Sequence, residues 1–145
     1  MEDLPPVPEP KLRDLPDWRY LLQEYYELYR FLPSGGSDRI RTHQRHVREA
    51  INRVLKSNPV IRTQPPAQKP VTAHLKRALD EGRGDRMAGM IRALESVQPA
   101  LSWQYGYEKV PKGLLGSYAY AEVIGPNGPV VSAEIILGVV LFAPS

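Results

Sequence analysis

The chain contains no cysteine, and this absence excludes several kinds of site. Its 145 residues include three His, two Trp and two Phe. Without thiols there is no disulfide framework, no thiolate metal site and no cysteine nucleophile, and a reducing compartment is the default expectation. The N-terminus is acidic and interrupted by proline, unlike a signal peptide. The longest apolar run, residues 135–143, is too short to span a bilayer as a helix. We therefore expect a cytoplasmic protein without a membrane partner.

Positive charge is concentrated in one segment of the chain. Residues 39–62 contain seven Lys or Arg and a single Glu. Such a stripe can attract nucleic acid or an anionic surface, but a solvated helix face is its commoner meaning. No aromatic residue lies between these arginines, although binding of single-stranded nucleic acid would require them. We expect no nucleic-acid partner.

The spacing of apolar residues predicts a helical region over residues 1–100. After a proline-rich lead-in (1–13), apolar side chains recur three and four positions apart up to Leu32, with Asp14 as a candidate cap. A second helix is predicted from the cap Ser37 to Lys56. Its predicted inner face consists of Ile40, His43, Val47, Ala50, Ile51, Val54 and Leu55.

The second half of this region contains a proline-rich connector over residues 57–70, which no helix can cross. Two shorter helices are predicted beyond it, over about 71–80 and 85–97.

From residue 101 the apolar period changes from 3.6 to 2, which predicts strands. Asn127-Gly128 predicts a hairpin turn, and residues 130–142 predict one or two further strands. The fold class is therefore α+β, in which helices are followed by the first antiparallel strands of a sheet over 101–145. The most apolar strand, 135–142, comes last and has no cover. We therefore expect either a longer parent protein or a homo-oligomer formed through this strand edge.

No self-sufficient catalytic set is evident in the sequence. His43 and His46 have the spacing of two metal ligands on a helix, but no third ligand lies nearby, so a structural or surface role is favoured. A glycine-rich phosphate loop and a nucleophile elbow are both missing. We assign no metal ligand and leave the catalytic residues unknown.

An aromatic cluster is the strongest candidate for a binding site. Tyrosines often pack on sheets for structural reasons alone, but an aromatic wall also attracts organic cations. If these strands form part of a barrel, Ala119 and Ala121 are too small to fill its interior, so the alternating tyrosines belong on the inner side. The candidate substrate-binding residues are Trp103, Tyr105, Tyr118, Tyr120 and Glu122.

Four segments carry a resemblance to a known family: 103–107 (WQYGY), 118–122 (YAYAE), 125–129 (GPNGP) and 137–144 (LGVVLFAP). Together they resemble the part of cupin-type dimethylsulfoniopropionate lyases that precedes the metal-binding motif. The resemblance implies a cupin-like β-barrel starting at residue 101 behind a helical N-terminal region. It also implies that the chain ends before the metal motif, so that the family's ligands and tyrosine base have no counterpart here.

The chemistry implied by the resemblance is β-elimination of a small sulfonium substrate to dimethyl sulfide and acrylate. It would use a divalent transition metal such as zinc, iron or manganese, with ligands outside this chain, and we expect the 145-residue chain to be inactive alone. Two alternatives stay open, because function depends on the site and not on the fold. One is another cupin enzyme, a dioxygenase or an isomerase, and the other is a non-enzymatic helical or cupin interaction module.

Overall fold

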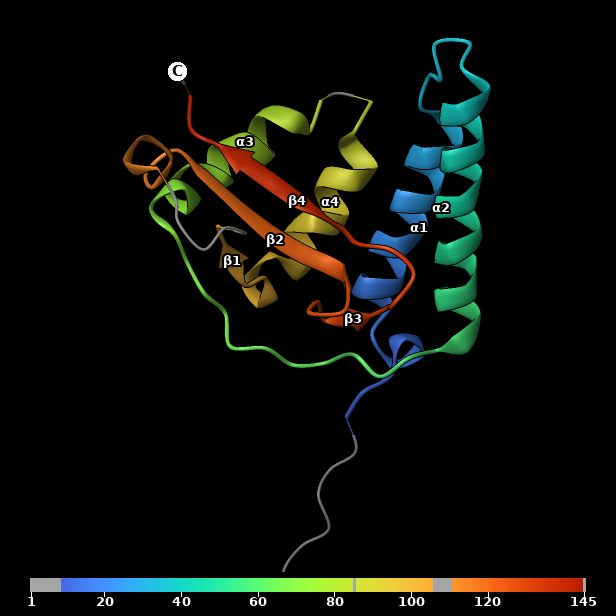
Figure 1. Ribbon diagram of the computed structural model, residues 1–145. Helices are drawn as coiled ribbons and strands as arrows, with labels where there is room; N and C mark the ends of the chain where they lie inside the picture. Colours follow the sequence, from blue (N-terminus) through green and yellow to red (C-terminus); the bar gives the residue numbers. More distant parts are fainter. Residues whose placement is uncertain (1–8, 85, 106–110, 145) are drawn as a thin grey trace, which may run out of the picture.

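The computed structural model describes residues 9–84, 86–105 and 111–144, which combine helices with one mixed sheet (Figure 1). This arrangement confirms the α+β class. The helices are α1 (Pro16–Phe31), α2 (Asp38–Ser57), α3 (Leu75–Gly82) and α4 (Ala88–Val97), with short 3-10 turns at Leu12–Asp14, Pro70–His74, Gln98–Ala100 and Lys112–Leu114. The strands are β1 (Trp103–Gln104), β2 (Tyr118–Gly125), β3 (Val130–Val131) and β4 (Leu137–Phe142).

Helices α1 and α2 form an antiparallel pair beside the sheet, while α3 and α4 lie behind it (Figure 1). The predicted start of α2 is confirmed, because the Ser37 hydroxyl accepts a hydrogen bond from the backbone N–H of Ile40 at 3.2 Å. Asp14 does not cap α1. Its carboxylate instead accepts a hydrogen bond from the backbone N–H of Lys11 at 3.1 Å, and α1 begins after Leu15.

The buried face of α2 differs from the predicted one. Ile40 and His43 are exposed, and Gln44 is buried in their place. The Gln44 side-chain amide donates to the backbone oxygen of Leu32 at 3.1 Å. A helix leaves its last carbonyls without partners, so a polar side chain that reaches the end of α1 replaces an apolar one here. Periodicity alone predicted the wrong residue because it ranks positions by apolarity.

Strand β2 is the centre of the sheet. It pairs antiparallel with β4, from Tyr118↔Phe142 to Ile124↔Leu137, and antiparallel with β1 at Trp103↔Ala121. It pairs parallel with β3 at Ile124↔Val130, so the expectation of a purely antiparallel sheet is wrong. The four strands do not close into a barrel, and the cupin-like barrel stays a prediction.

The predicted hairpin at Asn127-Gly128 is also wrong. Pro126 and Pro129 flank this dipeptide and have no N–H to donate to a ladder. The chain instead makes a wider turn that starts at Gly125, whose φ of 155° favours glycine. The strand that follows β2 in the sequence and pairs antiparallel with it is therefore β4 and not β3.

A single hydrophobic core joins the helices to the sheet. Ala119, Ala121 and Val123 on one side of β2 are fully buried, together with residues from α1, α2 and α4. The proline-rich connector is extended as predicted and runs along the sheet, with bridges Ile61↔Val130 and Ala67↔Ser102. Over the ranges that the structure describes, every helix is too short or too polar to traverse a lipid bilayer.

Candidate functional site

The two sides of β2 have different surroundings. Tyr118, Tyr120 and Glu122 share one side and are half-buried, whereas the intervening alanines are fully buried against the helical layer. The predicted alternation is thus confirmed. Helices cover the alanine side, and its small side chains let them pack closely against the sheet. That the tyrosine side faces the inside of a barrel stays a prediction.

The tyrosine side borders a hollow of about 580 Å³. Tyr120 and Glu122 line it from β2, and Ile136 lines it from the segment before β4. Polar groups come from three further parts of the chain. The other lining residues are Gln64 and Pro65 of the connector, Ser102 and Gln104 near β1, and Asn127 of the turn.

Both oxygens of the Glu122 carboxylate have a hydrogen-bond donor. The backbone N–H of Asn127 donates to Oε2 at 2.7 Å, and the Tyr120 hydroxyl donates to Oε1 at 3.3 Å. Burial, followed by the neighbouring Glu122 charge, raises the pKa of Tyr120 to about 12. Tyr120 is therefore protonated at neutral pH, and the hollow contains one carboxylate next to a neutral aromatic ring.

A glycine of β4 makes room for the Tyr120 ring. A Cβ added at Gly138 would lie 2.6 Å from ring atom Cε2 of Tyr120. The backbone oxygen of the same glycine accepts a hydrogen bond from the Tyr25 hydroxyl of α1 at 2.7 Å. Helix α1 thus fixes the part of β4 on which the ring rests.

The other predicted substrate-binding residues lie away from the hollow. Trp103 is 1% exposed and belongs to the core on the alanine side of the sheet. The Tyr105 hydroxyl donates to the backbone oxygen of Leu115 at 2.7 Å, and the Tyr105 ring lies 5.0 Å from the Lys69 ammonium. Tyr118 packs against Phe142, with ring centroids 5.7 Å apart. Tyr107, the remaining aromatic residue of the 103–107 segment, lies outside the described residues.

The connector and the turn supply polar groups that sequence reasoning missed. The Asn127 contribution is a backbone N–H, which no side-chain motif reveals. Gln64 lies in a segment whose prolines predict an extended backbone. They do not predict which parts of the chain that segment contacts. The alternating pattern of β2, by contrast, predicted that Tyr120 and Glu122 share one side of the strand, and both line the hollow.

The residues that the structure describes do not fit a metal ion. No three of their His, Cys, Asp or Glu side chains come together in a way that could hold one. His43 and His46 are both exposed on α2.

The arginines of α2 are largely engaged within the molecule. Arg48 donates to the backbone oxygen of Tyr29 at 3.0 Å, and Arg53 forms an ion pair with Glu134 at 2.5 Å. These contacts join α2 to α1 and to the segment before β4.

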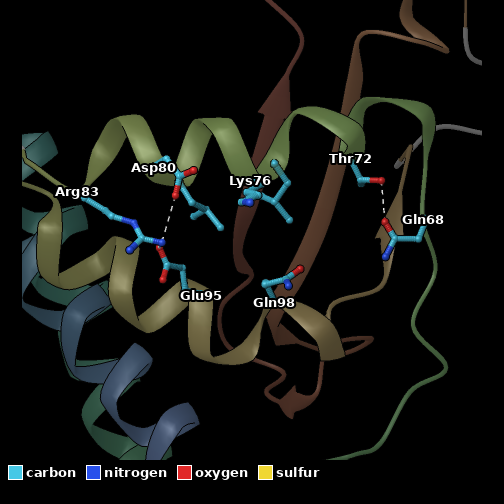
Figure 2. A pocket seen from close by; sticks show the side chains of 9 residues that line it. Gln68, Thr72, Lys76, Asp80, Arg83, Glu95 and Gln98 are labelled. Atoms are coloured by element: carbon cyan, nitrogen blue, oxygen red, sulfur yellow. Dashed lines mark hydrogen bonds and ion pairs between the residues drawn. The ribbon is translucent and has the colours of Figure 1, made fainter.

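A second hollow, of about 330 Å³, lies between α3 and α4 (Figure 2). Arg83 reaches across it and pairs with Asp80 at 3.2 Å and with Glu95 at 2.6 Å. The charges of Arg83, Asp80 and Glu95 in this hollow are therefore paired with one another. The hollow beside Tyr120 is the better candidate, because its carboxylate is bound only by neutral donors.

Comparison with known proteins places the chain in a family. The family model described as dimethylsulfoniopropionate lyase matches residues 43–145. The chain belongs to this dimethylsulfoniopropionate lyase family. The match includes every residue that lines the hollow beside Tyr120 and leaves out α1 with Tyr25.

A relative from Cereibacter sphaeroides agrees with the dimethylsulfoniopropionate lyase match. It bears the name "Putative dimethylsulfoniopropionate lyase DddL" and is 52% identical to this chain over 139 residues. The alignment covers 96% of this chain, which spans 60% of the length of the relative. No solved structure matches the chain.

Proposed function

We propose that this chain forms part of a lyase that cleaves dimethylsulfoniopropionate to dimethyl sulfide and acrylate. The observation that carries this proposal is the family match, which covers the whole Tyr120 hollow. The 52% identity to a protein named for the same activity supports it further.

In the proposed β-elimination, a base removes a proton from the carbon next to the substrate carboxylate. The electron pair left behind forms the double bond of acrylate, and the bond between the β-carbon and sulfur breaks. Sulfur keeps that bond's electron pair and leaves as neutral dimethyl sulfide. The positive charge of the sulfonium is therefore present in the substrate and lost in the products.

The role of the hollow is to bind the sulfonium end of the substrate. The Glu122 carboxylate attracts the positive sulfur, and the face of the Tyr120 ring adds a cation–π contact of about 0.5–2 kcal/mol. Because the pKa of Tyr120 is raised to about 12, its hydroxyl stays protonated and serves as a donor to Glu122. Proton removal from the substrate is assigned to another group.

The divalent transition metal expected from the family (zinc, iron or manganese) would need ligands other than the described residues. No step of the proposal passes through it. What the described residues contribute is recognition of the cation.

Headspace gas chromatography of dimethyl sulfide, together with chromatography of acrylate, tests the activity. The full-length product of the gene is incubated with dimethylsulfoniopropionate and Zn²⁺, Fe²⁺ or Mn²⁺, and the 145-residue chain is measured beside it. Release of both products in equal amounts supports the lyase. Consumption of the substrate without dimethyl sulfide, or no consumption with any of the three metals, overturns it.

A further inference from the structure

We propose that the proline-rich connector positions Glu122 for a cationic ligand and that Arg62 is its positioning residue. This inference rests on the proposed function in one respect, namely that the hollow beside Tyr120 binds a cation. It assigns a role to a segment that has no charged side chain among the residues lining the hollow.

The connector is fastened to the turn between β2 and β3 at several points. The Arg62 guanidinium donates through Nη2 to the backbone oxygens of Pro126 at 2.8 Å and Gly128 at 3.1 Å. The backbone N–H of Arg62 donates to the oxygen of Pro129 at 2.8 Å. One arginine thus holds three carbonyls of a turn that has two prolines and few N–H groups of its own.

Gln64 extends the same attachment by one more residue. Its side-chain amide donates to the backbone oxygen of Asn127 at 2.5 Å. The backbone N–H of Asn127 donates to Glu122 at 2.7 Å, and the carbonyl of the same peptide unit is that of Pro126, which accepts from Arg62 at 2.8 Å. The connector therefore fixes the peptide that binds the carboxylate.

The turn fits closely around the Glu122 side chain. A Cβ added at Gly125 would lie 2.7 Å from Glu122 Oε2, so the carboxylate lies directly against the turn backbone. A displaced turn would withdraw the Asn127 N–H and leave the carboxylate with the longer hydrogen bond from the Tyr120 hydroxyl. The chain of contacts runs from Arg62 through the turn to Glu122.

The sign of the effect separates positioning from simple charge. Arg62 is a cation close to a site proposed for a cation, so loss of its charge alone would strengthen ligand binding. Loss of positioning would weaken it. A fall in affinity when Arg62 is replaced by a neutral residue is therefore expected from lost positioning and not from lost charge.

Isothermal titration calorimetry of the 145-residue chain with trimethylsulfonium tests the proposal. Arg62→Met is expected to weaken binding by about 3- to 10-fold, an effect of the size of one ordinary hydrogen bond, because the Glu122 carboxylate stays in place but is held less firmly. Arg62→Lys keeps the charge and a donor group but loses the planar guanidinium, and is expected to recover part of the loss. Arg77→Met is the matched control, because Arg77 pairs with Glu81 on the exposed surface of α3, and this variant should bind like wild type.

A double-mutant cycle shows whether Arg62 acts through Glu122. In a Glu122→Gln background, Arg62→Met should cause no further fall in affinity, since the carboxylate it positions is gone. A general loosening of the hollow would instead cause the same fall in both backgrounds. If Arg62→Met does not fold, Gln64→Met replaces it, with a smaller fall expected in the same direction.

The possible results distinguish this inference from the proposed function. If wild type binds trimethylsulfonium and Arg62→Met binds equally well or better, the positioning role is overturned while the cation site stands. If wild type does not bind, the cation site fails. The NMR resonance of the Asn127 amide proton then tests whether Arg62 holds the turn. Arg62→Met should shift this resonance upfield, and an unshifted resonance would contradict the attachment.

Discussion

The hydrogen bond between Tyr25 and Gly138 joins helix α1 to strand β4, two elements that are far apart in the sequence. Tyr25 is 5% exposed, and its hydroxyl lies 2.7 Å from the Gly138 oxygen. Tyr25→Phe removes only this hydroxyl and keeps the packing of the ring. The variant leaves the Gly138 carbonyl without its donor from α1.

The expected loss of stability follows from the burial of this bond. Removing one partner of a buried hydrogen bond costs about 1–2 kcal/mol of unfolding free energy. For 145 residues the unfolding entropy is about 0.3 kcal/mol per kelvin. The melting temperature of Tyr25→Phe should therefore fall by about 3–7 °C.

Thermal unfolding followed by circular dichroism at pH 7 measures this difference. Tyr105→Phe is the matched control, because the Tyr105 hydroxyl also donates to a backbone oxygen at 2.7 Å, but at an exposed position. Water can replace that donor, so the control should lose less than about half as much. Equal losses in the two variants, or no loss in Tyr25→Phe, would refute the argument that burial sets the cost.

The same residue predicts how stability depends on alkaline pH. Burial, with smaller contributions from Tyr29 and Tyr120, raises the pKa of Tyr25 above its ordinary value of 10.0. A raised pKa in the folded state means that the stabilising contribution is complete below pH 10 and is lost as the pH rises further. Tyr25→Phe should consequently lose less stability than wild type between pH 10 and 11. Part of the loss should persist in the variant, because the pKa of Tyr120 is also raised, to about 12.

Three further changes test the site and its supports. Tyr120→Ala should weaken trimethylsulfonium binding by about 2- to 30-fold in calorimetry, and Tyr120→Phe by much less, because the ring remains; unchanged binding in Tyr120→Ala would contradict a cation–π contact. Gly138→Ala should lower stability by about 1–3 kcal/mol in urea unfolding, because the added Cβ would meet both the backbone oxygen of Ala121 and the Tyr120 ring; unchanged stability would contradict this close fit. Glu134→Gln should lower the melting temperature at low salt, with a difference that shrinks at high salt; a salt-independent difference would exclude the Arg53 pair as its cause.

Local structure was predictable where a single pattern determined it. The apolar spacing of residues 16–31 and the cap at Ser37 define α1 and α2 without reference to the rest of the chain. The alternation along β2 likewise placed Tyr120 and Glu122 on one side, since strand geometry allows no other arrangement. That alternation does not predict which side of β2 the helices cover, because both alanines and tyrosines can be buried.

The pairing of β3 depends on contacts between distant segments. Asn127-Gly128 favours a hairpin when the flanking residues can form a ladder, but here both neighbours are prolines. Arg62 and Gln64 then hold the turn from a segment more than 60 residues earlier. A sequence pattern read within a window of a few residues cannot contain this information.

The protonation state of Tyr120 limits the role that the described residues can have in an elimination. A tyrosine acts as a base only when its pKa lies near the working pH, and both burial and the Glu122 charge act in the opposite direction here. A bound sulfonium would offset part of the Glu122 charge, but the burial contribution, which is the larger, would remain. Glu122 already accepts two hydrogen bonds and lies where the cation is proposed to bind. The hollow is therefore suited to binding a cation rather than to removing a proton, and the proposed elimination assigns the base to a different group.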